Sequence, residues 1–249
     1  FKVDRGWNIN LSTARLYANS VCVGAGRAIT RASEGRPNLY TRKIFERALS
    51  KEYAHSVRDE KSKDYLESLG FKAINTGCPT TWCLTPELAA EIPATKASSV
   101  VTTLTDYAVD RDADSFLLDT LLERYETVSC WVQGSTDLAY LTSFKQSSHI
   151  DIIPPSLSAY SSVLNRDDTE YVGTRLHAGI YAMQHRTRSL IISVDNRASD
   201  MASSNGIPVL SRENREDLGR LIDSERATNL HVDLNSIEKW KSQFTANHA

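Results

Sequence analysis

Residues 170–194 read EYVGTRLHAGIYAMQHRTRSLIISV, and their pattern decides the expected fold. Residues 170–172 predict a short strand that stops at a glycine, and residues 176–184 predict a helix. The apolar run at residues 190–194 predicts a second, buried strand. Strand, helix and strand in succession predict two parallel strands joined by a right-handed crossover.

The same alternation extends over most of the chain and predicts an α/β protein with doubly wound parallel sheets. Asp59 and Gly70 are typical start and stop residues for one of the helices. Further strands are expected at residues 18–26, 53–57, 71–74, 99–104, 128–133, 150–153 and 207–210. Further helices are expected around residues 44–49, 60–69, 115–125, 136–144, 158–164, 213–222 and 237–244.

The domain organisation follows from a break in this alternation. Residues 85–97 hold Pro86 and Pro93 among small and charged residues, without a strand or long-helix pattern, so we expect the connection between two subdomains there. A chain of 249 residues with 41% hydrophobic content is long enough for two cores. The expected domains are residues 1–84 and 98–235, followed by a C-terminal helix and tail at residues 236–249.

Composition excludes several classes of protein. The net charge of −2 and the pI near 6.3 argue against a nucleic-acid partner. The cysteines at positions 22, 78, 83 and 130 form neither a disulfide framework nor a metal-binding motif, so we expect no metal. Without a run of about 20 apolar residues or a signal peptide, we expect a cytoplasmic protein with no transmembrane segment. Phe1, in place of an initial methionine, suggests a processed or fragmentary sequence.

Two candidate anion-binding positions lie where expected strands of the first subdomain end. Gly24-Ala25-Gly26 would let a backbone approach a ligand closely, although the same pattern also marks a tight strand exit. Arg58 follows the next strand and could clamp an oxyanion. The alternative for Arg58 is an ordinary surface salt bridge with Asp59.

The second subdomain offers two further strand exits with arginines. Arg175 and His177 fall at the start of one helix, where an arginine can hold an anion while a histidine exchanges a proton. The alternative is that His177 is a helix-start histidine bound to backbone. Asn196 and Arg197 follow the strand at residues 190–194. If both subdomains face each other, we expect these arginines to converge on one cleft.

These residues carry a family resemblance. Arg175-Leu-His-Ala178, the later Asp195-Asn-Arg197, the stretch SVRDEKS at residues 56–62 and the upstream glycines together resemble the polysaccharide pyruvyltransferases. The resemblance covers about residues 18–222. It implies two Rossmann-like subdomains, as in glycosyltransferases of the two-domain type, with phosphoenolpyruvate bound in the cleft. It also implies a truncated N-terminal subdomain, because only a short stretch precedes residue 18.

By the resemblance, Arg58 and Arg175 hold the phosphate and carboxylate of the donor, and His177 transfers a proton. This makes Arg58 and His177 the expected catalytic residues. Arg197 stands where the family often has lysine. The expected substrate-binding residues are Arg175, Leu176, Asn196, Arg197, Gly24 and Gly26. No cofactor is expected, since phosphoenolpyruvate is itself the donor substrate.

The expected function is transfer of a pyruvyl group from phosphoenolpyruvate to the hydroxyls of a cell-envelope or exopolysaccharide sugar, forming a pyruvate ketal. The acceptor would be a sugar or a lipid-linked oligosaccharide, reached from the cytoplasm or at the inner face of the membrane. Two alternatives stay open: a nucleotide-sugar glycosyltransferase, and a non-catalytic relative in glycan assembly. The oligomeric state is open as well, a homo-oligomer included.

Overall fold

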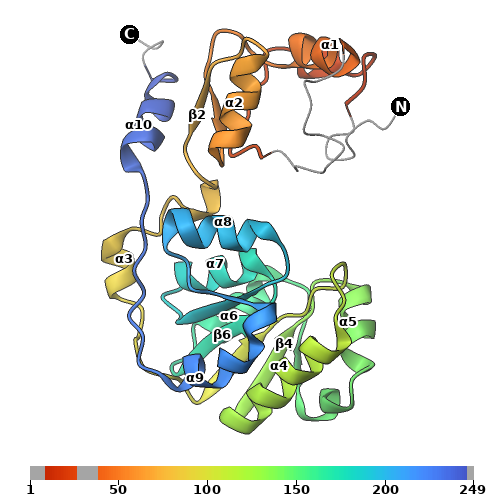
Figure 1. Cartoon of the computed structure of the whole chain (residues 1–249), viewed down its shortest axis with the longest axis vertical. Helices are drawn as coiled ribbons and strands as arrows, with labels where there is room; N and C mark the ends of the chain where they lie inside the picture. The colour runs from red at the N-terminus through yellow and green to blue at the C-terminus, as the bar shows by residue number, and fades with distance from the viewer. Residues whose placement is uncertain (1–8, 27–38, 246–249) are drawn as a thin grey trace. The chain divides into compact units, whose positions relative to one another are not determined.

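The computed structural model describes residues 9–26 and 39–245, and the chain divides into two compact units (Figure 1). Unit 2 is Cys83–Val232, and unit 1 combines Phe1–Trp82 with Asp233–Ala249. The boundary therefore precedes the expected connection at residues 85–97. The short helix α3 (Pro86–Ala90) forms there because Thr85 Oγ1 accepts the N–H of Leu88 at 3.4 Å and a proline occupies the first turn.

Unit 2 contains a parallel sheet in the order β5-β4-β3-β6-β7-β8, which confirms the doubly wound α/β prediction. The central strand β3 pairs on both sides, since Val101 lies opposite Ser129 on one neighbour and Tyr171 on the other. The strands are β3 (Ser99–Thr102), β4 (Thr127–Trp131), β5 (Asp151–Ile153), β6 (Thr169–Gly173), β7 (Ser189–Ser193) and β8 (Val209–Ser211).

Helices cover both faces of this sheet, and each face has its own core (Figure 1). Leu118 and Ile222 belong to the core on the face of α4 and α9, whereas Tyr160 and Ile180 belong to the core on the face of α6 and α7. The helices of this unit are α4 (Arg111–Arg124), α5 (Ser135–Thr142), α6 (Leu157–Leu164), α7 (Leu176–Gln184), α8 (Asn196–Asn205) and α9 (Leu218–Asp223), with 3₁₀ turns η3 (Lys145–His149) and η4 (Arg212–Asp217).

Some of the expected helices differ in detail from the sequence pattern. Helix α4 begins one turn early, because the carboxylate of Asp110 accepts the N–H of Ala113 at 3.0 Å. Asp114 consequently lies inside the helix and is buried. The helix expected at residues 213–222 is broken, since Asn214 has non-helical dihedral angles and a 3₁₀ turn precedes α9.

Unit 1 contains the parallel pair β1 (His55–Val57) and β2 (Ala73–Asn75), connected by α2 (Glu60–Ser68). The carboxylate of Asp59 accepts the N–H of Ser62 at 2.7 Å, so the expected helix cap is confirmed. Gly70 follows the helix with φ of +83°, as expected for its end. The remaining elements of this unit are η1 (Ala14–Tyr17), α1 (Leu39–Ala48), η2 (Pro79–Thr81) and α10 (Leu234–Ser242).

The strand expected at residues 18–26 is instead an irregular segment with isolated bridges from Ser20 to Leu49 and from Ala25 to Val57. Gly24 has φ of +60°, which interrupts the extended backbone. The N–H of Cys22 donates to Nδ1 of His55 at 3.1 Å, a side chain, so the backbone ladder is broken at this position. The segment is therefore held beside β1 partly by side chains.

The C-terminal segment belongs to unit 1, although the sequence pattern set it apart as a separate tail. Trp240 of α10 is buried and donates its indole N–H to the carbonyl of Ala54 at 2.8 Å. The N–H of Ala54 in turn donates to the side-chain oxygen of Gln243 at 2.7 Å. Across the described residues, no helix has both the length and the apolar character needed to span a bilayer.

Candidate functional site

The strand order of unit 2 reverses between β3 and β6, because the chain runs outward from β3 through β4 and β5 before it returns to β6. In open parallel sheets, ligands bind at this switch point, outside the carboxyl ends of the two strands. Here the switch point is flanked by the loop from Thr103 to Asp110 and by Thr174 and Arg175. The expected helix-start residues Arg175 and His177 therefore lie at the edge of the sheet where a ligand site is expected.

The two strand exits contact each other closely. Thr174 N–H donates to the carbonyl of Thr103 at 3.0 Å, and Arg175 N–H donates to Oγ1 of Thr103 at 3.2 Å. Gly173 makes this approach feasible, because a Cβ at that position would lie 2.6 Å from the nitrogen of Thr103. The glycine that ends β6 is thus required by backbone packing at the switch point.

Arg175 is the N-cap residue of α7, and its side chain crosses the switch point. Nε donates to the carbonyl of Leu104 at 3.1 Å. Nη2 donates to Oδ1 of Asp106 at 2.8 Å and to Oδ1 of Asp137 at 2.5 Å. The side chain is only 18% exposed, so the guanidinium is held in one orientation. The expected anion-binding role of Arg175 stays a prediction, and two carboxylates now accompany it.

Asp106 and Asp137 were not recognised from the sequence as site residues. The hydroxyl of Thr136 and, secondarily, the charge of Arg175 hold the pKa of Asp106 below its usual value, so this carboxylate is ionised at neutral pH. Asp137 is buried, and its second oxygen accepts the N–H of Gln133 at 2.9 Å. Asp106 follows a predicted strand closely, which was the only available signal; Asp137 resembled an ordinary first-turn acid.

The first turn of α7 lacks a side-chain cap, since Arg175 does not accept a hydrogen bond from it. Uncapped N–H groups at a helix start, together with the helix dipole, favour an anion. His177 is the second residue of this helix and its side chain is exposed, as a proton-transfer role requires. Leu176 packs against the core on the α6 and α7 face, so the backbone is its only group suited to an anion.

The expected site residues after β7 are only partly described. Asn196 is the first residue of α8, directly after the half-buried Asp195. The side chains of Asn196 and Arg197 lie outside the described residues. Their expected roles in substrate binding therefore stay predictions.

In unit 1, the structure brings Gly24, Gly26 and Arg58 together. Arg58 N–H donates to the carbonyl of Ala25 at 3.0 Å, and a Cβ on Gly26 would lie 1.9 Å from Nε of Arg58. A Cβ on Gly24 would lie 2.1 Å from Cδ of Pro79. The glycines thus make room for neighbouring side chains, which is a packing reason for the motif.

The alternative interpretation of Arg58 as a salt-bridge residue also has support. Its Nε lies 3.7 Å from Oδ2 of Asp59, and both side chains are about one third exposed. A pair of this length and exposure contributes little to stability and leaves the guanidinium able to bind a ligand. The two groups of candidate residues belong to different units. Their convergence on one cleft stays a prediction.

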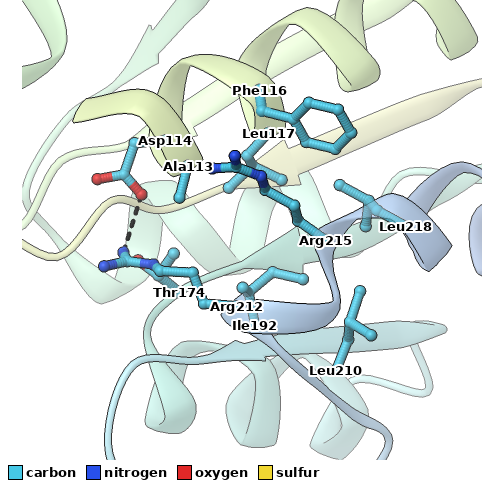
Figure 2. Close-up of a pocket in the computed structure, with 10 residues that line it drawn as sticks. All are labelled: Ala113, Asp114, Phe116, Leu117, Thr174, Ile192, Leu210, Arg212, Arg215 and Leu218. Carbon is cyan, nitrogen blue, oxygen red and sulfur yellow. Dashed lines mark hydrogen bonds and ion pairs between the residues drawn. The ribbon is translucent and has the colours of Figure 1, made fainter. Parts of the chain in front are cut away.

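A small pocket is lined by residues of α4, β7, β8, η4 and α9 and by Thr174, which follows β6 (Figure 2). Arg212 donates to Asp114 across it at 2.9 Å, and the hydroxyl of Tyr140 donates to the same carboxylate at 2.6 Å. Burial raises the pKa of Asp114. The enclosed space of about 10 Å³ holds about one water molecule, so this pocket is a packing gap and not a substrate site.

Fold and site together define a class of protein: a two-unit α/β protein that presents an arginine and a histidine at the switch point of a doubly wound sheet. A family model described as polysaccharide pyruvyl transferase matches residues 36–196, which is more than half of the chain. The chain therefore belongs to the polysaccharide pyruvyl transferase family and is a transferase. This confirms the family resemblance found in the sequence.

One solved epimerase structure has a fold similar to that of this chain. UDP-GlcNAc 2-epimerase of Methanocaldococcus jannaschii, solved with UDP-GlcNAc and UDP, aligns over 95% of this chain and 72% of its own, with 13% identity and a TM-score of 0.54. At that identity the likeness concerns the fold alone.

Two further structures match with TM-scores below 0.5. A UDP-N-acetylglucosamine 2-epimerase has 12% identity and a TM-score of 0.46, with 88% of this chain and 58% of its own length aligned. LpCGTa in complex with UDP has 14% identity and a TM-score of 0.39, with 94% and 63% aligned. The chain thus spans less than two thirds of these two proteins. A search of curated proteins found no match.

Proposed function

We propose that this transferase moves a pyruvyl group from phosphoenolpyruvate to two hydroxyls of a polysaccharide sugar and forms a pyruvate ketal. The observation that carries the proposal is the Arg175-Leu-His177 segment at the uncapped start of α7. This segment lies within the residues that match the pyruvyl transferase family model. A donor with a phosphate and a carboxylate suits a site that combines helix N–H groups with a guanidinium.

The chemistry adds one proton to a carbon, removes one proton from each of two hydroxyls, and forms two carbon–oxygen bonds while one breaks. The methylene carbon of the donor gains a proton, which we assign to His177, while a sugar hydroxyl attacks the neighbouring carbon and gives its own proton back to the imidazole. That carbon then loses inorganic phosphate as its bond to the phosphate oxygen breaks. A second hydroxyl attacks the same carbon and releases its proton, so the products are the cyclic ketal and phosphate.

The charges at the switch point indicate which groups contact each part of the donor. The two carboxylates of Asp106 and Asp137 carry more negative charge than the positive charge of the Arg175 guanidinium. The guanidinium alone therefore binds an anion weakly. We propose that the α7 N–H groups contact the phosphate and that Arg175 orients the donor. The donor-binding role of Arg58 is part of the same proposal, on the basis of the family resemblance.

Thermal-shift titration of the full chain tests the donor. A ligand that binds the native state at 100 times its Kd stabilises the protein by about 2.7 kcal/mol, so saturating phosphoenolpyruvate should raise the Tm by several degrees. UDP-sugars and GDP-sugars at the same concentration serve as comparison. Incubation with phosphoenolpyruvate and extracted glycan should release phosphate and form the ketal, read out by mass spectrometry.

The outcomes separate the candidate functions. Stabilisation by nucleotide sugars and not by phosphoenolpyruvate would contradict the proposal in favour of a glycosyltransferase. Binding of phosphoenolpyruvate without release of its phosphate in the presence of any glycan tested would instead favour a non-catalytic relative.

A further inference from the structure

We infer that Tyr107 and Asp106, in the loop after β3, form a subsite for the pyranose ring of the acceptor sugar. This inference rests on the proposed function and adds where the acceptor binds and by which contacts. The observations are the exposure of the aromatic ring, the anchoring of its loop, and the charge of the neighbouring carboxylate.

The aromatic ring is presented to solvent by an anchored loop. Tyr107 is 61% exposed, although Thr103, Leu104 and Thr105 at the strand exit are buried. Before it, the hydroxyl groups of Thr105 and Thr174 lie 2.9 Å apart. After Tyr107, the carbonyl of Ala108 accepts a hydrogen bond from Nη1 of Arg212 at 2.8 Å. A large aromatic held outward at the end of a strand offers a flat apolar face, which is what a sugar ring stacks on.

The ring also lies beside the proposed donor site. Cζ of Arg175 is 5.6 Å from the centroid of the Tyr107 ring. The same arginine contacts Asp106 at 2.8 Å. Only the Arg175 side chain would therefore separate a sugar stacked on Tyr107 from a donor oriented by Arg175. The sugar hydroxyls would lie close to the donor, as the transfer requires.

The carboxylate of Asp106 favours the neutral acceptor sugar over the anionic donor. Its side chain is 29% exposed, and its lowered pKa keeps it ionised. An ionised carboxylate accepts hydrogen bonds from sugar hydroxyls and repels a phosphate. The acceptor is thereby directed to the Asp106 side of Arg175, and the anionic donor to the α7 side.

Steady-state kinetics on the full chain test the subsite, because the acceptor KM and the donor KM should respond differently to the same substitution. Loss of the stacking surface should weaken acceptor affinity by roughly two- to tenfold, which corresponds to about 0.4–1.4 kcal/mol. Tyr107→Ala should raise the acceptor KM by about that factor, while the donor KM and the thermal shift with phosphoenolpyruvate stay near wild type. Tyr107→Phe keeps the ring and should restore the acceptor KM. Asp106→Asn should also raise the acceptor KM.

Direct sugar binding keeps this inference separable from the proposed reaction. Saturation-transfer NMR with methyl glycosides of glucose, galactose, mannose and N-acetylglucosamine should show binding to the wild type without any donor. Tyr107→Ala should lose that signal. Tyr17→Ala, which removes a 46% exposed tyrosine of unit 1, is the matched control and should keep it.

Each outcome decides one of the two proposals. Sugar binding that depends on Tyr107, in a protein that phosphoenolpyruvate does not stabilise, supports the subsite and removes the proposed reaction. An unchanged acceptor KM and an unchanged NMR signal in Tyr107→Ala overturn the subsite and leave the reaction standing. Absence of binding by all four glycosides to the wild type also overturns the subsite.

Discussion

At the switch point, the Arg175 side chain is positioned by contacts with three other residues. Its Nε and Nη2 are occupied by Leu104, Asp106 and Asp137, whereas Nη1 has no hydrogen-bond acceptor among the described residues. A planar guanidinium can serve several acceptors in fixed directions, which a lysine ammonium cannot. The three contacts therefore position Arg175, and the remaining N–H groups can face a ligand.

His177 belongs to the same scale, and its replacement tests the proposed proton transfer. His177→Ala should lower kcat by about 10²- to 10⁴-fold, because that is the usual contribution of a positioned general acid or base. The thermal shift with phosphoenolpyruvate should persist in this variant. The measurement is steady-state phosphate release with glycan acceptor.

His185→Ala is the matched control, because His185 lies just after the other end of α7 and its Nδ1 contacts Oδ1 of Asn165 at 2.8 Å. This variant should keep near wild-type kcat. Near wild-type kcat in His177→Ala as well would remove the catalytic assignment.

At the scale of elements, side chains replace part of the backbone ladder in unit 1. His55 is buried at the start of β1, where Nδ1 accepts the N–H of Cys22 and Nε2 donates to the carbonyl of Ser50 at 2.9 Å. These two partners require the neutral imidazole with its proton on Nε2. Gly24 N–H likewise donates to Oγ of Ser56 at 2.8 Å. The segment at residues 20–25 thus depends on the neutral form of His55.

This dependence predicts a pH effect on unit 1. Burial lowers the pKa of His55 below its usual value of about 6.5, so the folded state disfavours the charged imidazole. The stabilisation is complete above pH 6.5 and is lost as the pH falls from there through the lowered pKa. Hydrogen exchange at Cys22 and Ser56 should accelerate as the pH falls through this window, after correction for the intrinsic rates.

His55→Asn provides the control, since an amide oxygen can accept the Cys22 N–H without titrating. Its corrected exchange rates should not depend on pH in that window. An equal pH dependence in both proteins would show that another group titrates there.

At the scale of the whole molecule, unit 1 is built from two separate parts of the sequence. Helix α10 closes it, because Trp240 packs against Trp82 with ring centroids 5.8 Å apart and against Phe244 at 5.1 Å. The hydrogen bonds from this helix reach the backbone of Ala54, directly before β1. Residues 234–244 therefore pack as part of the first unit, far along the chain from its other elements.

Trp240→Ala should destabilise unit 1 by about 3–5 kcal/mol, the usual cost of deleting a buried aromatic side chain. The indole hydrogen bond to Ala54 is lost together with the ring packing. Hydrogen exchange followed by mass spectrometry should show the largest acceleration in peptides that cover β1 and β2. Leu234→Ala removes a half-exposed side chain of the same helix and should change these peptides little. Equal effects of the two variants would contradict a structural role for Trp240.

The sequence predicted local structure well, because local structure follows from nearest neighbours. The alternating strands and helices, the Asp59 cap and the start of α7 at Leu176 each depend on residues close in the chain. The family segment Arg175-Leu-His177 was also readable, since it is contiguous. Errors occurred where a distant residue took over a local contact, as His55 does for Cys22.

The sequence by itself determined the α/β class, the parallel pairing and the helix start that presents Arg175 and His177. Only the tertiary structure decided that Asp106 and Asp137 meet Arg175, that Tyr107 stands beside it, and that the C-terminal helix closes unit 1. The reason is that periodicity and capping act over a few residues, whereas these contacts join residues 38 to 189 positions apart. Only the packing of the folded chain brings such residues together.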